Sequence, residues 1–382
     1  MTIQSENDII AALGNGRRRS VFGSKLISPA HTAGGWHLLA GISGDPVATT
    51  FPGTDLMFKS CSEQAGDGTN LFGIQHGGDV SPNIKHAIIT AASIVAAAGA
   101  PWFAQLVDVQ GYYRLSTTNV TGTGSRVLLN GETFTANAGT DIITYALDWN
   151  TFTKVRFTTT GTLPAGLSLN TDYWLVRQSA TTAKVASSFA NALAGTTIDI
   201  TDTGTGTHTL TARVPRADGG IGVEASLVVQ TAPTAGGPNM TASSYTNAAG
   251  TAGRAFQNSP TMGAAADAYA GRILHSGNAA GRYGPFLSKQ SGDTGIRSIE
   301  SFTLSGGTAY TGTGVLAMVL AKPLGRPVPI ASTGMYTERE LKNQIPSLPI
   351  IEPGACLAWM LMSTGATTNL SPLTFDADFI WG

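Results

Sequence analysis

The chain has 382 residues, of which 12% are charged, and its formal net charge is −1 at pH 7. Soluble domains typically carry about 25% charged residues, so this chain is poor in charge. A near-neutral chain has no basic excess to bind phosphates, and we expect no nucleic-acid partner. Short side chains such as Thr, Ser and Gly lose little rotamer entropy when they are ordered, which favours a protein that packs against copies of itself or against partners.

Export and membrane insertion are not expected. The N-terminus lacks a basic region followed by an apolar run, so we predict no signal peptide. The longest apolar stretch, 87–100, is shorter than the roughly 20 residues that span a bilayer. Cys61 and Cys356 are too few for a disulfide framework or a metal site. The apolar neighbours of Cys356 are typical of a buried free thiol.

A short helix is predicted at the N-terminus. Ser5 can act as its N-cap, and Ile9, Ile10 and Leu13 form an apolar stripe. Glycine and asparagine at 14–16 end the helix.

A short basic run follows this helix. We interpret residues 1–20 as an N-terminal arm in which Arg17, Arg18 and Arg19 are candidate anchors to a neighbouring subunit. The alternative is a solvated or salt-bridged chain end, because single short basic runs are weak signals.

Strand patterns dominate the rest of the outer region. Residues 84–90 and 102–115 are apolar and β-branched, and a plausible turn separates them. An Ala-rich helix over 87–98 is the alternative. Gly and Pro turns punctuate the later predicted strands, which are 223–231, 299–304, 315–321, 355–362 and 373–381.

One further helix is predicted at 337–344, where Thr337 and Glu340 match a capping box and Pro346 ends the segment. Many strands with Gly/Pro turns and few helices predict an all-β protein whose main domain is a β-sandwich or jelly roll.

The segment 116–212 differs in texture, because threonine is frequent and strand patterns are closely spaced. These patterns cover 153–158, 172–177, 183–186, 197–200 and 206–210. We predict a small β domain here, inserted into a main domain formed by 21–115 and 213–382. Insertion at a loop costs little when its ends are close, so the flanking strands 102–115 and 221–230 are expected to be neighbours in one sheet.

Tyr173 and Trp174 are the aromatic pair of this segment. They are candidates for a surface contact of the insert. Packing in its core is the favoured interpretation, because aromatic residues in strands usually pack.

Two sets of residues resemble bacteriophage proteins. The stretches 155–167, 170–176 and 198–208 resemble a small module of tailed-phage virion proteins. The stretches 244–254, 295–300 and 379–382 resemble phage head proteins that coat or cement the shell. The resemblance implies a β-sandwich-like structural protein and supplies no catalytic residue.

Catalytic chemistry is not indicated by the sequence. The six histidines lack ligands at zinc spacing, and no Gly-x-Ser-x-Gly elbow accompanies the His-Gly-Gly stretch at 76–78. We therefore expect no catalytic residue, no metal and no cofactor. A depolymerase is disfavoured for the same reason.

The leading hypothesis is a decoration or cement protein in the virion, which binds the major capsid protein and copies of itself, as a trimer in the simplest case. Multivalent weak contacts would supply the affinity. The alternatives are a tail, collar or fibre component with a glycan-binding role, and the major capsid subunit itself.

Overall fold

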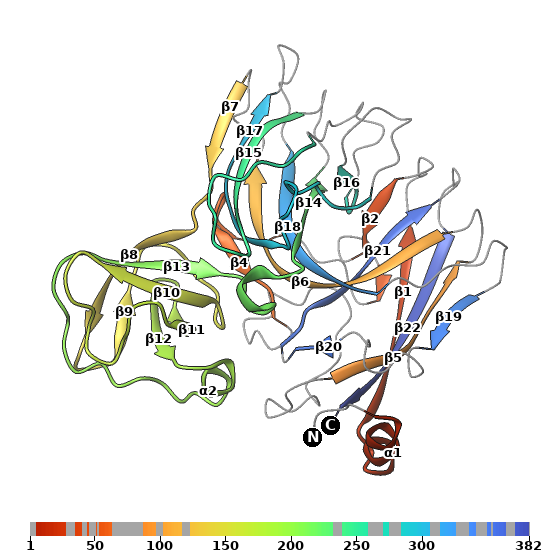
Figure 1. The fold of residues 1–382 in the computed structure, drawn as a ribbon, viewed down its shortest axis with the longest axis horizontal. Coiled ribbons are helices and arrows are strands. Elements are labelled where there is room, and N and C mark those ends of the chain that lie inside the picture. Colours follow the sequence, from red (N-terminus) through yellow and green to blue (C-terminus); the bar gives the residue numbers. More distant parts are fainter. Residues whose placement is uncertain are drawn as a thin grey trace.

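The computed structural model describes residues 5–27, 35–39, 44–45, 51, 53–62, 87–96, 102–116, 123–231, 239–258, 270–274, 284–305, 314–325, 336–340, 350–352, 354–363 and 371–381. Antiparallel strands account for most of the described secondary structure, which confirms the all-β prediction. The strands form a six-stranded sheet, a seven-stranded sheet, a three-stranded sheet and a closed barrel (Figure 1).

The predicted N-terminal helix is present as α1 (Glu6–Gly14). The Ser5 hydroxyl accepts a hydrogen bond from the Asp8 backbone N–H at 3.3 Å, and the Asp8 carboxylate accepts one from the Ser5 N–H at 2.9 Å. This reciprocal capping box satisfies amides that the helix start leaves unpaired. Ile9 is buried, whereas Ile10 is exposed, so one face of the helix packs and the other faces solvent.

Replacing Ser5 with Ala is expected to cost about 1 kcal/mol of local helix stability, because the cap bond to the Asp8 amide is lost. Amide hydrogen exchange over 6–14 measures this as faster exchange. Ser5→Asp keeps an acceptor at the cap and should exchange at close to the original rate. Equal exchange in the Ala variant would contradict the role of the cap.

The six-stranded sheet joins the two ends of the chain. Its order is β19-β5-β22-β1-β3, with β20 also on β5. The strands are β1 (Arg18–Ile27), β3 (Gly44–Asp45), β5 (Ala87–Ala96), β19 (Tyr336–Glu340), β20 (Ile350–Ile351) and β22 (Ser371–Trp381).

One helix alternative and one helix prediction fall in this sheet. The Ala-rich helix over 87–98 is wrong for 87–96, because that segment is β5. The capped helix at 337–344 is wrong for 337–340, where Thr337 lies opposite Ile94 of β5, and 341–344 lies outside the described residues. Pairing with a long strand outweighs the local signals here, because helix propensity is worth only fractions of a kcal/mol per residue and a single cap about 1 kcal/mol.

The seven-stranded sheet has the order β16-β14-β18-β6-β21-β2, and β4 also pairs with β6. Its strands are β2 (Trp36–Leu38), β4 (Phe58–Ser60), β6 (Trp102–Ser116), β14 (Glu224–Thr231), β16 (Ile273–Leu274), β18 (Val315–Gly325) and β21 (Leu357–Ser363). The strands that flank the insert, β6 and β14, share this sheet. They are not neighbours as expected, because β18 pairs with both and lies between them.

The three-stranded sheet contains β15 (Asn239–Asn247), β17 (Ile296–Ser305) and β7 (Thr123–Val127). Strand β7 lies within the predicted insert, yet it pairs with β17, with Val127 opposite Ser301. Its strand partner therefore belongs to the outer region, and the barrel strands begin only at Gly131.

The barrel closes in the order β10-β11-β12-β9-β8-β13. Its strands are β8 (Gly131–Asn137), β9 (Ile142–Thr144), β10 (Lys154–Thr159), β11 (Asp172–Ser179), β12 (Thr182–Ala186) and β13 (His208–Arg213), and a short helix, α2 (Phe189–Leu193), lies in the same segment. In β10, Val155 and Phe157 are buried and alternate with more exposed residues, as the side-chain period of a strand requires. The predicted strand at 197–200 is not one, although Ile200 is fully buried.

A polar cluster lies next to the three-stranded sheet. It surrounds Asp293, which precedes β17 and whose side chain is almost fully buried. Its carboxylate accepts hydrogen bonds from Tyr245 Oη at 2.5 Å, Asn247 Nδ2 at 2.8 Å and Arg254 Nε at 3.0 Å. The bond from Arg254, followed by those from Tyr245 and Asn247, lowers the pKa of Asp293 to about 2.

Asp293→Asn is expected to destabilise the protein at neutral pH and to change its acid sensitivity. A carboxyl whose pKa is lowered by folding stabilises the fold above its unfolded value of about 3.9, and this contribution disappears as the pH falls towards about 2. Urea unfolding at several pH values should therefore show the difference between the two proteins shrinking from about pH 4 to about pH 2. A difference that does not vary with pH would contradict this assignment.

Candidate functional site

The junction between the barrel and the sheets is the candidate site, because it sets how the barrel is presented. Gly131 at the start of β8 lies opposite Thr211 of β13. The Ala212 N–H donates to the Asn130 carbonyl at 2.8 Å. The chain therefore enters and leaves the barrel side by side, and the barrel projects from the sheets (Figure 1).

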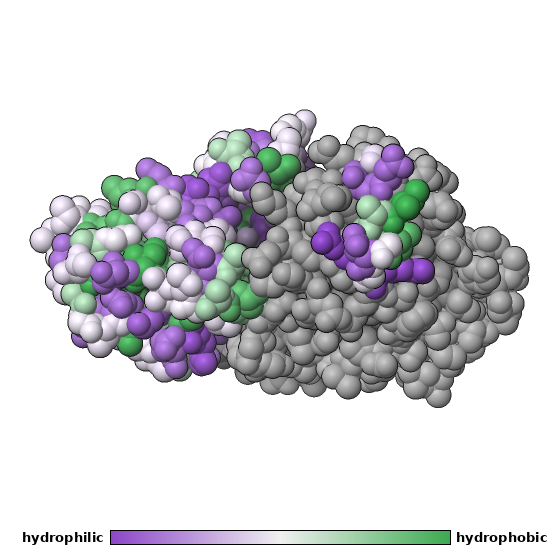
Figure 2. Space-filling model, turned by 90° about the horizontal axis from the view of Figure 1, so that it is seen from below, coloured by the Kyte–Doolittle hydropathy of each residue, from purple (hydrophilic) through white to green (hydrophobic). Residues whose placement is uncertain are grey.

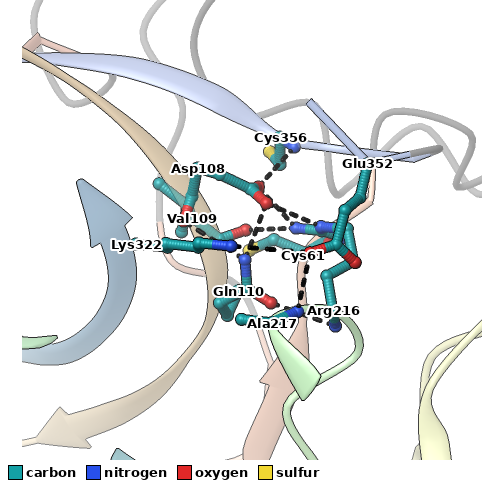
Figure 3. A network of polar contacts seen from close by, with 9 residues as sticks. All are labelled: Cys61, Asp108, Val109, Gln110, Arg216, Ala217, Lys322, Glu352 and Cys356. Carbon is teal, nitrogen blue, oxygen red and sulfur yellow. Dashed lines mark hydrogen bonds and ion pairs between the residues drawn. The ribbon is translucent and has the colours of Figure 1, made fainter. Parts of the chain in front are cut away.

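Arg216 anchors the segment that returns from the barrel (Figure 3). It is only 6% exposed. Its Nε and Nη2 donate to the two carboxylate oxygens of Asp108 on β6, at 2.9 and 2.7 Å. The same guanidinium donates to the carbonyls of Cys61 at 2.8 Å and Val109 at 2.7 Å. A bidentate pair of this kind fixes geometry as well as charge.

Asp108 has further donors, so its buried charge is well compensated. The Cys356 N–H donates to it at 2.9 Å, and Gln110 Nε2 donates at 2.7 Å. The Gln110 side-chain oxygen in turn accepts the backbone N–H of Arg216 at 3.0 Å. Residues before β21, on β6 and after the barrel are thereby held in one network.

The electrostatics of this network favour a permanently charged arginine. Burial alone would lower the pKa of Arg216, but the charge and hydrogen bonds of Asp108 outweigh it, so the pKa lies above its ordinary value. Glu352 extends the network, because it accepts the Ala217 N–H at 3.1 Å and lies 3.7 Å from Lys322 Nζ.

A second buried contact fixes the barrel next to the first, because Asn150 binds the carbonyl of Ser60 and Arg216 binds that of Cys61. Lys59 on β4 is 4% exposed, and its Nζ donates to the Asp148 carbonyl and, at 3.2 Å, to the Asn150 side chain. Asn150 Nδ2 donates back to the Ser60 carbonyl at 3.2 Å. Two separate attachments, at Arg216 and at Lys59, hold the base of the barrel against the seven-stranded sheet.

The apolar core is continuous across the same junction. One buried cluster contains Trp149 and Phe157 of the barrel segment together with Tyr113 and Met318 of the seven-stranded sheet. Since apolar burial is the main favourable term in folding, the barrel packs as part of the body and not as a loosely tethered unit.

The predicted N-terminal arm is shorter than expected. Arg18 and Arg19 already belong to β1, where they lie opposite Ile380 and Phe379 of β22. Pairing with β22 begins at Arg18, so the last three residues of the predicted arm, 18–20, lie in the six-stranded sheet. Arg17 is half-exposed and Arg18 is exposed, and their proposed contact with a neighbouring subunit stays a prediction.

The aromatic pair of the insert divides between core and surface. Tyr173 lies in the barrel core, 5.4 Å from the ring of Phe157, and its hydroxyl accepts the Ser168 N–H at 2.8 Å. Burial removes Tyr173 as a surface contact. Trp174 is half-buried, with Lys154 Nζ 5.4 Å from its ring centroid, so it keeps some area for a partner.

Within the described parts of the chain, no three His, Cys, Asp or Glu side chains are placed to hold a metal ion. Among those same residues, no helix is both long and apolar enough to cross a membrane.

Comparison with known proteins gives distant matches. No protein-family profile and no curated protein matches the sequence. The matching solved structures include the VP2 subviral particle of infectious bursal disease virus, with 9% identity, a TM-score of 0.19, and 96% of this chain and 80% of that chain covered. The structure of the Gt strain of infectious bursal disease virus matches with 11% identity and a TM-score of 0.19, and 95% of this chain and 80% of that chain are covered. Superpositions at such TM-scores do not establish a shared fold.

Proposed function

We propose that this chain is a structural subunit of a tailed-bacteriophage particle, and that it decorates and stabilises the head. In this proposal it binds the major capsid protein and copies of itself, as a trimer in the simplest case, and works without a catalytic residue or cofactor. The resemblance of the barrel segment to a virion module supports the phage assignment. The low charge and the all-β architecture support the structural role.

The observation that carries the proposal is the rigid mounting of the barrel. A closed barrel leaves no sheet edge open for unwanted pairing, and two buried polar attachments fix its base. Such a mounting suits a projection whose position on a lattice must be defined. A module that searched for ligands would gain from a flexible linker instead.

The surface carries apolar and weakly polar residues that can make many weak contacts. Figure 2 shows apolar and weakly polar residues interspersed with hydrophilic ones over the barrel. Among the described residues, the exposed large apolar side chains lie at four places: a pair on α1, a pair at and just after the end of β7, one between β10 and β11, and one before β14. They are Ile10, Leu13, Val127, Leu129, Leu169 and Ile221. Scattered contacts add up when several copies bind one lattice, because binding becomes multivalent.

The test uses heads of the parent phage assembled without this chain. The purified chain is expected to bind them at a fixed copy number relative to the shell protein, and to raise the temperature at which the heads lose DNA. A variant in which a short Gly-Ser linker replaces 131–211 keeps the paired barrel ends at Asn130 and Ala212 close. Its binding shows whether the main sheets or the barrel hold the shell. Absence of the full-length chain from heads would overturn the decoration role.

Trp174 favours one alternative, a tail or fibre component that binds host glycans, because the exposed part of a half-buried tryptophan can contact a sugar ring. An adsorption assay of the purified chain on host cells separates the two functions. Binding to cells that is lost in Trp174→Ala, together with no binding to heads, would favour the glycan role.

A further inference from the structure

Cys61 and Cys356 lie at a break in one edge of the seven-stranded sheet. Both β4 and β21 pair with the same side of β6: β4 ends with Ser60 opposite Gly111, and β21 begins with Leu357 opposite Asp108. The two cysteines occupy the positions between these ends. The Cys61 N–H donates to the Gln110 carbonyl at 3.0 Å, and the Val109 N–H donates to the Cys356 carbonyl at 2.8 Å.

The two backbones are therefore separated by about one strand position. Consecutive positions along a strand are about 3.3 Å apart, and disulfides join Cα atoms that are roughly 4.4–6.8 Å apart. A separation of one to two positions is therefore compatible with a disulfide, and the Cys356 thiol lies within hydrogen-bond reach of the Cys61 thiol.

Both thiols also point to the same side of the sheet. Neighbouring residues of a regular strand face opposite sides, but β6 has a bulge at this level. Leu320 of β18 lies opposite Gly111, the next residue Ala321 lies opposite Val109, and Gln110 is skipped. Cys61 and Cys356 consequently share one apolar cluster, and both are buried thiols outside any disulfide.

We propose that Cys61 and Cys356 form an intramolecular disulfide site, which stays reduced in a cytoplasm and closes when the protein meets oxidising surroundings. The cross-link would join the end of β4 to the start of β21, directly beside the Arg216–Asp108 pair (Figure 3). This proposal does not depend on the proposed function.

The bond forms by two thiol–disulfide exchanges with a small-molecule disulfide such as oxidised glutathione. One cysteine thiolate attacks a glutathione sulfur and releases the first glutathione thiolate, which takes up the proton that the cysteine lost. The second cysteine thiolate attacks the mixed disulfide and releases the second glutathione, which is protonated in the same way. The two protein sulfurs are oxidised, and one glutathione disulfide is reduced to two thiols.

Burial decides how fast this occurs. Burial, followed by the neighbouring Cys356 thiol, raises the pKa of Cys61 well above its ordinary value. The reactive thiolate is therefore scarce in the folded protein, and the pair should resist brief exposure to oxidants but close slowly or during refolding.

The experiment oxidises the full chain by two routes. In the first, the native protein is incubated for days with diamide, a small oxidant that accepts the two hydrogens of a thiol pair. In the second, the reduced, denatured chain is refolded in oxidised glutathione. Each sample is denatured, alkylated with iodoacetamide and weighed by intact mass spectrometry. We expect an unalkylated chain lighter by two hydrogens and a linked peptide containing both cysteines, with a higher Tm than the reduced protein.

Cys61→Ser and Cys356→Ser serve as matched controls. Each should keep one alkylated thiol under both routes and show no oxidation-dependent change in Tm. Two alkylated cysteines in the wild type by both routes would overturn the proposal. Stable glutathione adducts, or bonds between copies in place of the internal one, would overturn it equally.

Discussion

Replacing Arg216 with Met is expected to lower the free energy of unfolding by about 3–5 kcal/mol, because removing one partner of a buried ion pair leaves the other charge uncompensated. Asp108 would keep its hydrogen bonds from Gln110 and Cys356 but lose both guanidinium contacts. The carbonyls of Cys61 and Val109 would also lose their donor. Urea unfolding measures the change in the free energy of unfolding, and the m-value of each variant shows whether the transition stays two-state.

Two further variants isolate the cause. The double variant Arg216→Met with Asp108→Asn removes the stranded charge, so it should be more stable than Arg216→Met alone. Arg177→Met serves as the exposed counterpart, since Arg177 pairs with Asp148 at 2.9 Å where both side chains are substantially exposed. That change should cost no more than about 1 kcal/mol. Equal losses of unfolding free energy in Arg216→Met and Arg177→Met would show that the buried pair contributes no more to stability than the exposed pair.

Replacing Phe157 with Ala is expected to cost about 3–5 kcal/mol, because a large buried ring leaves a cavity that its neighbours fill only in part. Phe157 is fully buried in the barrel, with the rings of Phe134 and Tyr173 at 5.0 and 5.4 Å. The barrel shares its core cluster with the seven-stranded sheet. The whole protein should therefore still unfold in one transition, but at a lower urea concentration.

Phe157→Leu keeps an apolar side chain of intermediate size and should lose clearly less stability than the Ala variant. Limited proteolysis tests the second part of the expectation. If the Ala variant is cut within 131–213 while the sheets resist, the barrel unfolds separately and the shared core does not couple the two parts.

Strands were predictable from sequence where the local pattern was strong. Val155 and Phe157 alternate with polar residues, and the predicted strand 153–158 matches β10 (Lys154–Thr159) within one residue at each end. Long-range pairing was not predictable, because the residues that decide it lie far apart in the chain. Thr337 has a sound capping signal, yet it lies in a strand. The reason is that its segment pairs with β5, which lies more than two hundred residues earlier in the chain.

The junction left one signal in the sequence that could have been used. Asp108 stands directly beside Leu106, Val107 and Val109, and a charge in such an apolar stretch requires a buried partner. Nothing local identifies that partner as Arg216, which lies on the far side of the barrel segment. Lys59 and Asn150 gave no signal for the same reason, because their contact depends on tertiary structure alone.

The pairing of β1 with β22 has a consequence for biosynthesis. Arg18 lies opposite Ile380, so the central ladder of the six-stranded sheet joins residues from the first and last parts of the chain. β22 leaves the ribosome long after β1, whereas the strands of 131–213 emerge between them and pair with one another. We therefore expect the barrel strands to pair before the six-stranded sheet closes, since contacts distant in sequence form late.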